Sequence, residues 1–396
     1  MPVKRHYYNR LTTNNMSAIK NKKIAIIGGG PGGLTLARLL QMNGADVKVY
    51  ERDASKDARM QGATLDLHEE SGLNALTHAG LMEAFMANYR PGADQMRITD
   101  KHATILFDDD ENEASDRSRP EIDRGPLQNI LLDSLEPGTV VWNSHFLALT
   151  PQGDSWRLEF KTNDPIIAHI VIGADGGKSK VRPYITPIKP FFAGVTAIEG
   201  AVYNSETESP KIHKLLNGGK IFAMDDEKTL IVSSKGEGSL VFYTSFKTDE
   251  NWSRECGIDF SNKAQVFSWF KKDYAAWDSI WLELFENANH NFIPRPLYCM
   301  PLDQTWEALP NLTMLGDAAH LMPPFAGEGV NMAMLDALEL SNCLLSEDFH
   351  DTGSAIAAYE TRMRIRASAT AKDTMISTDM LHSKNAIRFM LDILTP

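Results

Sequence analysis

The sequence predicts an α/β protein that is built on a Rossmann-type parallel sheet and carries a second, β-rich domain as an insertion. Two observations support this prediction. A glycine-rich turn joins an apolar strand to a helix near the start of the chain, and residues 191–275 change to short strand-like segments separated by Gly, Asn and Asp turns. With 396 residues, the chain is long enough for two domains.

The first βαβ unit spans residues 22–51. Residues 24–27 form a short apolar segment of the kind buried in parallel sheets. Residues 34–40 continue with helical spacing, and Asn43-Gly44 is a helix stop signal. Residues 47–50 are a second strand, which ends at Glu51.

The remaining elements alternate less regularly along the chain. A helix is expected at 127–135, with Pro126 in its first turn. Apolar runs predict further buried strands at 166–172 and 312–315. Residues 329–346 and 354–394 have helical patterns, and we expect the second of these helices to be broken. Strands of the inserted domain are expected at 220–224, 229–233 and 239–245.

The glycines between the first strand and the first helix match a dinucleotide-binding turn. Gly28 permits the tight turn, Gly30 lets a pyrophosphate approach the backbone, and Gly33 lets helix and strand pack closely. The helix N-terminus supplies free N–H groups for the phosphates. Glu51, at the end of the next strand, is placed to accept hydrogen bonds from a ribose. This pattern alone does not choose between NAD and FAD.

A segment far downstream makes that choice. Gly316-Asp317 follows an apolar strand, and a Pro- and Gly-rich stretch, residues 323–331, leads into a helix at Gly329. A carboxylate at a strand end can hold the hydroxyls of a ribityl chain, which a nicotinamide cofactor lacks. The helix N-terminus can stabilise negative charge on a reduced flavin. The sequence therefore favours FAD.

Composition excludes several classes of function. The net charge of −12 argues against binding to nucleic acid, which requires neutralisation of phosphates. Three dispersed cysteines suggest neither a disulfide framework nor a metal site, and we expect a cytoplasmic protein without a metal. No apolar run reaches the roughly 20 residues that span a bilayer, and the basic residues 1–20 lack the apolar core of a secretory signal.

These motifs, in this order, resemble the para-hydroxybenzoate hydroxylase-like FAD-dependent monooxygenases, with signatures at 28–33, 175–176 and 316–317. Within that group the chain looks most like the tetracycline-inactivating flavin monooxygenases. The similar runs are VYERD at 49–53, TLDLH at 64–68, PEIDR at 120–124, SKVR at 179–182 and GDAAHLMPPFAG at 316–327. The resemblance covers nearly the whole chain from Lys22 onward and is thin in residues 190–275.

The resemblance implies a glutathione reductase-like FAD-binding domain, an inserted β-sheet substrate domain and a C-terminal bridging helix. It assigns residues 21–78, 105–190 and 280–325 to the FAD-binding domain, 79–104 and 191–279 to the substrate-binding domain, and 326–396 to the bridging helical region. From their composition, residues 1–20 are expected to be a disordered basic extension, or residues upstream of a start at Met16.

The resemblance also implies site residues. Glu51 should hold the adenosine ribose and Asp317 the ribityl and pyrophosphate region. The FAD contacts are expected from Gly28, Gly30, Gly33, Arg52, Asp66, Arg124, Pro324, Gly327, Gly329 and Val330, and Arg59 is expected to meet NADPH. No protein side chain is predicted to act as the catalytic base; His320 is expected to be a packed, hydrogen-bonded histidine.

The substrate residues depart from the tetracycline-degrading members, which present Gln, Arg and His from the sheet of the substrate domain. This chain has Glu199, Lys220 and Val241 at the corresponding positions, and Ile376 where the degraders have Asn. Lys lacks the planar fork of Arg, and Val cannot form hydrogen bonds. Phe222, Pro324, Phe325, Gly327 and Met380 complete the expected substrate set. These changes suggest a different substrate or a weak activity on tetracycline.

The expected function is that of an NADPH-consuming monooxygenase that uses FAD and O2, through a flavin C4a-hydroperoxide, to hydroxylate a polycyclic or aromatic enol or phenol. Tetracycline is one candidate substrate. The alternatives are another aromatic hydroxylase, a flavin-dependent reductase of the same fold, and a protein that sequesters FAD and a ligand without turnover. Because a bridging helix joins both domains within one chain, we expect a monomer.

Overall fold

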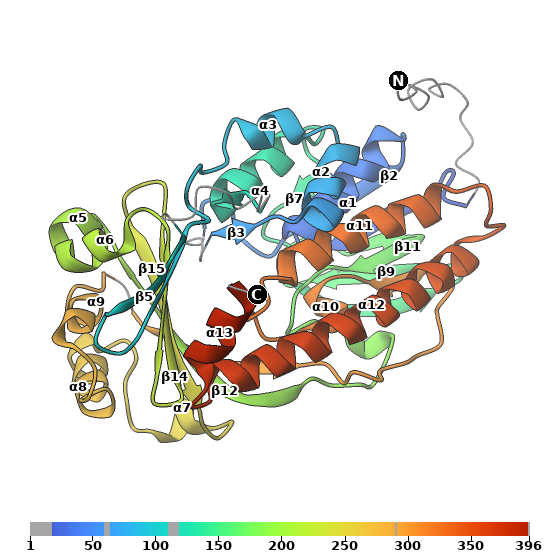
Figure 1. Cartoon of the computed structure of the whole chain (residues 1–396). Coiled ribbons are helices and arrows are strands. Elements are labelled where there is room, and N and C mark those ends of the chain that lie inside the picture. The colour runs from blue at the N-terminus through green and yellow to red at the C-terminus, as the bar shows by residue number, and fades with distance from the viewer. Residues whose placement is uncertain (1–17, 59–63, 110–118, 290, 395–396) are drawn as a thin grey trace.

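The computed structural model describes residues 18–58, 64–109, 119–289 and 291–394. Two sheet-based parts lie side by side, and a long C-terminal helix runs along both of them (Figure 1). This architecture confirms the predicted fold class. Residues 1–17, most of the expected basic extension, lie outside the described residues, whereas Ala18 and Ile19 are buried at the edge of the core.

The first part is built on a five-stranded parallel sheet. Its strand order is β17 (Leu312–Met314), β11 (Ile170–Gly173), β1 (Lys23–Ile27), β2 (Asp46–Tyr50) and β7 (Val140–Val141). Every neighbouring pair is parallel. The central strands are short and almost wholly apolar because both faces of the sheet are covered.

Helices cover one face of this sheet. These are α1 (Pro31–Met42), α4 (Arg124–Asp133), α11 (Gly329–Leu345) and the first half of α12 (Thr352–Leu381), and they share a large apolar core with β1, β2 and β11. The short elements η1 (Glu69–Leu73), α2 (Asn74–His78) and α3 (Met82–Met86) extend this layer.

The other face is covered by a three-stranded antiparallel sheet of β8 (Phe146–Gln152), β9 (Ser155–Phe160) and β10 (Ile166–Ala168). The single strand predicted at 166–172 was therefore wrong in one respect. It divides at His169 into β10 and β11, which belong to different sheets. Hydrophobicity could not indicate the division, because both segments are apolar.

The second part is a seven-stranded sheet. Its order is β16 (Ile293–Cys299), β12 (Phe191–Val202), β15 (Leu240–Lys247), β14 (Lys228–Ser234), β13 (Lys220–Asp225), β4 (Met96–Thr99) and β5 (Ile105–Asp108). Strands β5 and β16 fall within ranges that we had assigned to the FAD-binding domain. Backbone pairing places them in the larger sheet instead, β5 on β4 and β16 on β12.

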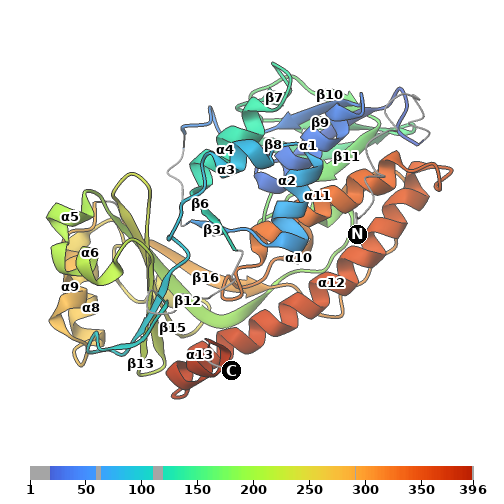
Figure 2. The same ribbon diagram turned by 45° about the horizontal axis from the view of Figure 1, so that its top comes forward.

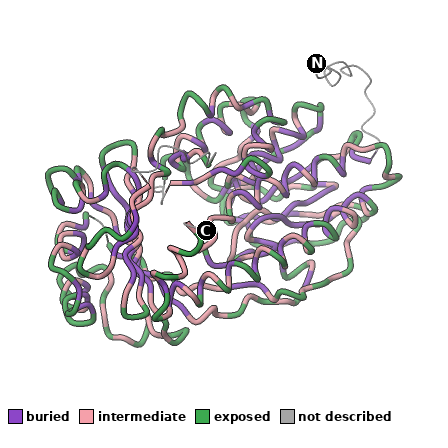
Figure 3. Tube along the Cα trace, in the orientation of Figure 1, coloured by how far each residue is buried: buried purple, intermediate pink, exposed green. Residues whose placement is uncertain are grey.

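One face of this sheet is covered by α6 (Pro210–Leu216), α8 (Lys263–Asp273), η4 (Ser279–Trp281) and α9 (Leu282–Glu286), which pack on alternate residues of its strands. The short helices α5 (Ser205–Glu208) and α7 (Trp252–Glu255) flank them. Because side chains alternate along a strand, every second side chain points to the opposite face of the sheet. This face is turned toward the parallel-sheet part (Figure 1). In Figure 3 the strands of both sheets are mostly buried.

Helix α13 (Ala386–Leu394) follows α12 after a short break, as predicted from the helical pattern. Together they join the two parts, the position that the family resemblance implied. Both views show α12 running from the parallel-sheet part to the seven-stranded sheet (Figures 1 and 2). Near its start, the Tyr359 hydroxyl donates to the carbonyl of Met314, with 3.1 Å between the oxygens. Near its end, the Lys247 ammonium lies 3.4 Å from a carboxylate oxygen of Asp379. No described helix is long and apolar enough to cross a membrane.

Candidate active site

The turn between β1 and α1 has the geometry of a phosphate-binding loop. Gly28 has φ +113°, and a Cβ there would lie 2.2 Å from the carbonyl oxygen of Ala174. A Cβ on Gly33 would lie 2.2 Å from the carbonyl oxygen of Gly28. Gly30 differs, since a Cβ there would meet no described atom within 4 Å. Gly28 and Gly33 are therefore required by the fold, whereas Gly30 borders the space where a pyrophosphate would lie at the start of α1.

Glu51 fixes the rim of this turn. Its Oε2 accepts a 2.6 Å hydrogen bond from the backbone N–H of Gly29, and its Oε1 accepts one of 3.0 Å from the N–H of Asp53. A carboxylate in this position, at the end of β2, is placed to accept a hydrogen bond from a ribose hydroxyl. Arg52, the next residue, is exposed, and Arg59 lies outside the described residues.

The turn after β11 is joined to the one after β17. The Asp175 carboxylate accepts from the Ser179 hydroxyl at 2.6 Å and from the Lys180 N–H at 2.7 Å. This cap orients the buried Arg182, whose guanidinium donates to the carbonyls of Ala318 at 2.7 Å and Asp317 at 2.9 Å. Arg182 thus holds the backbone of the short helix α10 (Asp317–His320), a role that our residue assignments missed.

Asp317 begins α10, directly after Gly316. Burial raises the pKa of its carboxyl, while the positive charges of His320, Arg124 and Arg182 oppose that shift. Within the described residues, no donor forms a hydrogen bond to the Asp317 carboxylate. A carboxylate that is partly buried and still able to accept matches the predicted contact with a ribityl chain. Arg124, the first residue of α4, is close enough for its charge to act on Asp317.

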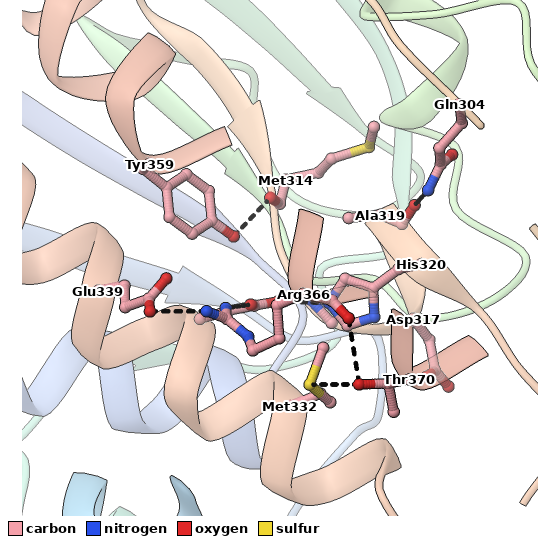
Figure 4. Close-up of polar contacts among 12 residues, drawn as sticks. Gln304, Met314, Asp317, Ala319, His320, Met332, Glu339, Tyr359, Arg366 and Thr370 are labelled. Carbon is pink, nitrogen blue, oxygen red and sulfur yellow. Dashed lines mark hydrogen bonds and ion pairs between the residues drawn. The ribbon is translucent and has the colours of Figure 1, made fainter. Parts of the chain in front are cut away.

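A buried polar network lies beside Asp317 (Figure 4). His320 Nε2 lies 2.5 Å from Asp336 Oδ2, and that oxygen also accepts from the N–H of Gly316 at 2.9 Å. The other Asp336 oxygen accepts from Arg366 at 2.6 Å, and Arg366 in turn bridges to Glu339. This confirms His320 as a packed, hydrogen-bonded residue. Asp336 and Arg366 belong to no motif, so no sequence pattern indicated them.

The Pro- and Gly-rich loop before α11 is fixed by residues in and just after β3 (Leu65–Asp66). Gly327 has φ +71°, and a Cβ there would lie 3.0 Å from Asp66 Oδ2. The buried Asn331 side chain accepts from the N–H of His68 at 2.9 Å and donates to the carbonyls of Asp66 at 2.9 Å and Gly327 at 3.3 Å. Asp66 is thus next to the loop before α11, in which flavin contacts are expected, and Gly329 and Val330 begin α11 just beyond this loop.

His68 lies between two carboxylates. Its Nε2 is 3.1 Å from Asp66 Oδ2, and its Nδ1 is 3.4 Å from Glu328 Oε1. Burial would lower the pKa of His68, but the hydrogen bonds and charges of Asp66 and Glu328 prevail and raise it to about 9. His68 is therefore an imidazolium at neutral pH. Burial also opposes ionisation of Asp66, yet His68 and Lys220 lower the pKa of that carboxyl.

The predicted substrate residues of the sheet share one face. Lys220 pairs in register with Ser233, Ser233 with Val241, and Val241 with Ala201. Two residues further along β13, Phe222 pairs with Ile231, Ile231 with Tyr243, and Tyr243 with Glu199. This face is opposite to the helix-covered core, whose members alternate with these residues along each strand.

Charged partners engage two of these residues. The Glu199 carboxylate pairs with Arg295 of β16, and the Lys220 ammonium pairs with Glu121 of β6 (Glu121–Ile122). The Lys220 contact crosses from the seven-stranded sheet to the parallel-sheet part. Val241 is buried on the sheet face. Neither Arg295 nor Glu121 was among the predicted site residues.

An apolar cluster joins β13 and α13 to the loop before α11. Phe222 and Phe325 pack with residues of α13 in one cluster. The Phe325 ring also meets the imidazole of His382 edge-on, with centroids 5.1 Å apart. Pro324 is exposed and Met380, near the end of α12, is half-buried. The structure therefore brings Phe222 and Phe325 together.

His382 connects α12 to the sheet. Its Nε2 accepts from the Ser245 hydroxyl at 2.8 Å, and its Nδ1 donates to the carbonyl of Thr378 at 2.7 Å. Burial lowers the pKa of His382 to about 4, with Lys247 assisting and the Thr378 carbonyl and Asp379 opposing. The imidazole is neutral at pH 7. No sequence pattern indicated this residue.

Comparison with known proteins identifies the class. The family model described as FAD binding domain matches residues 21–292 and 304–374, and the chain belongs to this family. The monooxygenase asqM of Emericella nidulans is 30% identical over 370 residues, which cover 81% of this chain and 83% of that protein. The 3-amino-4-hydroxybenzoate 2-monooxygenase PtmB3 of Streptomyces platensis is 28% identical and covers 87% of this chain and 85% of its own.

A solved structure agrees in fold. The tetracycline destructase Tet(51) superposes with a TM-score of 0.70 at 18% identity, covering 94% of each chain. These findings confirm the predicted class, an FAD-dependent monooxygenase. The fit of the residues agrees with it, since Gly30 leaves room for a pyrophosphate and the Asp317 carboxylate is able to accept hydrogen bonds.

Proposed function

We propose that this chain is an NADPH-consuming FAD monooxygenase that hydroxylates a polycyclic or aromatic phenol or enol. One juxtaposition carries the proposal. Lys220, on the substrate face of the sheet, pairs with Glu121, and Glu121 pairs in register with Asp66. The Asp66 carboxylate lies against Gly327 in the expected flavin loop. A substrate held by the sheet face would thus lie close to the flavin edge.

The residues of the chain have distinct roles in this proposal. The Gly28 turn and the N-terminus of α1 bind the pyrophosphate, Glu51 binds the ribose, and Asp317 orients the ribityl chain. The N-terminus of α11 at Gly329 and Val330 stabilises negative charge on the ring. When bound and reduced, FAD supplies the electrons and the activation of O2 for insertion of one oxygen atom.

The remaining site residues orient the substrate and exclude water. Phe222 and Phe325 present apolar surface between the sheet and the flavin loop, and Met380 lies at the end of the bridging helix. Excluding water strengthens each charged contact within such a site. Arg52 and Arg124 remain proposed FAD contacts.

The substrate proposal follows from the chemistry of the sheet face. Glu199 is engaged by Arg295, Val241 offers no hydrogen bond, and Lys220 presents a single ammonium. These groups suit a substrate with one acidic oxygen better than the polar edge of a tetracycline. The phenolic substrate in the name of PtmB3 supports the same class. We further infer a monomer, since α12 joins both parts within one chain, and the cytoplasmic location remains a prediction.

The test is to purify the FAD-loaded protein and follow NADPH and NADH oxidation with a panel of phenols and tetracyclines. We expect O2-dependent oxidation of NADPH that is faster with a phenol present, and a product heavier by one oxygen atom. Ligand binding without NADPH consumption would instead indicate a sequestering protein. Ligand turnover that persists without O2 would indicate a reductase.

A further inference from the structure

The ion pair between Lys220 and Glu121 lies where the two parts of the molecule meet. Lys220 projects from β13, and its side chain is 19% exposed. Glu121 projects from β6, and its side chain is 1% exposed. The Lys220 Nζ donates to Glu121 Oε1. A lysine on the substrate face therefore has a nearly inaccessible carboxylate as its partner.

The second oxygen of Glu121 is unusual. Oε2 is buried, and no hydrogen bond to this oxygen is found in the part of the chain that the structure describes, although the Thr64 side chain interacts with the same carboxylate. A buried carboxylate oxygen without a donor is destabilising, and such groups are uncommon in folded proteins. A structural ion pair requires only Oε1. The unsatisfied Oε2 is consistent with an oxygen that receives a proton during function.

The surroundings favour proton uptake by Glu121. Burial raises the pKa of its carboxyl, Lys220 and Thr64 oppose this shift, and the charge of Asp66 adds to it. Asp66, at the end of β3, already pairs with His68. On the other side, Asp123 is held by Arg90 at 3.6 Å and by the N–H of Gly236 at 2.9 Å. The neighbouring sheet residues Ser233 and Val241 carry no charge.

We propose that Lys220 and Glu121 together bind and deprotonate an acidic hydroxyl of the substrate. This inference rests on the proposed function and names the two residues that bind and ionise its phenol or enol substrate. The O–H bond of the substrate breaks, and its proton forms a new O–H bond with Glu121 Oε2. The resulting oxyanion becomes the partner of the Lys220 ammonium. No electrons are transferred, and the net charge of the three groups is unchanged.

This exchange explains the choice of lysine. An ammonium is a compact point charge that suits one oxyanion, whereas the planar fork of an arginine suits two oxygens. Proton transfer to Glu121 also removes the charge that otherwise competes for Lys220. The deprotonated substrate is more electron-rich and therefore more reactive toward an electrophilic oxygen.

The probe for the test is 4-nitrophenol, whose phenolate absorbs visible light. It is added to the FAD-loaded protein, and both phenolate formation and proton release to a weakly buffered solution are measured against pH. For the wild-type protein we expect the bound probe to ionise at least about one pH unit below the free probe. We also expect almost no proton release, because Glu121 takes up the proton.

Two variants separate the roles. Lys220→Met should abolish the shift in ionisation. Glu121→Gln should keep the shift but release close to one proton for each phenolate bound, because the internal acceptor is missing. The matched control is Lys101→Met, which removes a lysine that pairs with Asp225 and Asp226 on the surface at the end of the same strand. This control should behave as the wild type.

If Lys220→Met does not fold or retain FAD, Lys220→Arg and Glu121→Gln carry the test. Lys220→Arg should keep the lowered ionisation. A wild-type protein that binds only the neutral phenol or does not bind the probe, a Lys220→Met that retains the shift, or a Glu121→Gln with unchanged proton balance would overturn the inference. Failure of the wild type to consume NADPH with O2 would instead contradict the proposed function.

Discussion

At the scale of single residues, the glycines of the first turn are not equivalent. Gly28 and Gly33 are constrained by protein atoms, since a Cβ at either would lie 2.2 Å from a backbone oxygen. Gly30 has open space around its missing Cβ. A sequence motif treats these positions alike, whereas the structure shows that only Gly30 can report on the cofactor separately from the fold.

We therefore predict that Gly30→Ala leaves the stability of the apoprotein unchanged within roughly 0.5 kcal/mol, because the new methyl group meets no described atom and the gain from restricting an extended backbone offsets the weaker N-cap. Affinity for FAD should fall by about tenfold or more, which corresponds to about 1.4 kcal/mol. Urea unfolding of the apoprotein and titration of the apoprotein with FAD measure the two effects. Unaltered FAD affinity would place the pyrophosphate elsewhere.

At the scale of elements, two buried histidines hold neighbouring elements together, and one of them is protonated while the other is neutral. His68 fastens β3 to the loop before α11 as an imidazolium, and His382 fastens the end of α12 to β15 as a neutral ring. Their burial is similar, so neighbouring charge decides the difference. Two carboxylates face His68, whereas a hydroxyl and a carbonyl face His382.

The pKa of His68 in the folded state is about 9, above its unfolded value of 6.5. Its contribution to stability is therefore complete below pH 6.5 and is lost as the pH rises to about 9. We expect this loss to approach about 3 kcal/mol. Denaturant unfolding between pH 6 and 10 should show the decline in the wild type and a reduced decline in His68→Gln. His78→Gln, at an exposed histidine on α2, is the control and should match the wild type.

The pKa of His382 is about 4, below its unfolded value. The unfolded chain therefore binds the proton first, and stability should fall by up to about 3 kcal/mol as the pH drops from 6.5 to 4. His382→Phe should lower stability at pH 7 by about 1–2 kcal/mol, since the Ser245 hydroxyl loses an acceptor, but should weaken the acid-dependent decline. If thermal unfolding showed that the stability of this variant falls equally steeply between pH 6.5 and 4, the proposed role of His382 would be contradicted. The control is His102→Gln, at an exposed histidine, which should show the same acid-dependent loss of stability as the wild type.

At the scale of the whole molecule, the sequence was most informative where one motif fixes local geometry. The Gly28 turn, Glu51 and Gly316-Asp317 were predictable because each requires a particular residue type at a strand end. The inserted sheet was predictable as a β-rich segment, but its edge strands were not. Strands β5 and β16 join it through backbone pairing over long sequence separations, which local hydrophobicity does not encode.

The polar contacts of the site also include residues that could be predicted from the sequence and residues that could not. Lys220 was identified through family resemblance, but its partner Glu121 is 99 residues away in the chain. Asp336, Arg366 and His382 act through tertiary contacts, and each lies within an ordinary helical pattern. Long-range pairs of this kind appear only when the two parts of the molecule are brought together.

The central claim is that this fold holds FAD through the first glycine turn and the carboxylate of Asp317. The most direct measurement is the visible absorption spectrum of the purified wild-type protein beside that of Asp317→Ala, each with and without added FAD. We predict a flavin spectrum for the wild type and at least about a tenfold weaker affinity for FAD in the variant. A wild-type protein that stays colourless and does not take up FAD, or an Asp317→Ala that binds FAD equally well, would contradict this account.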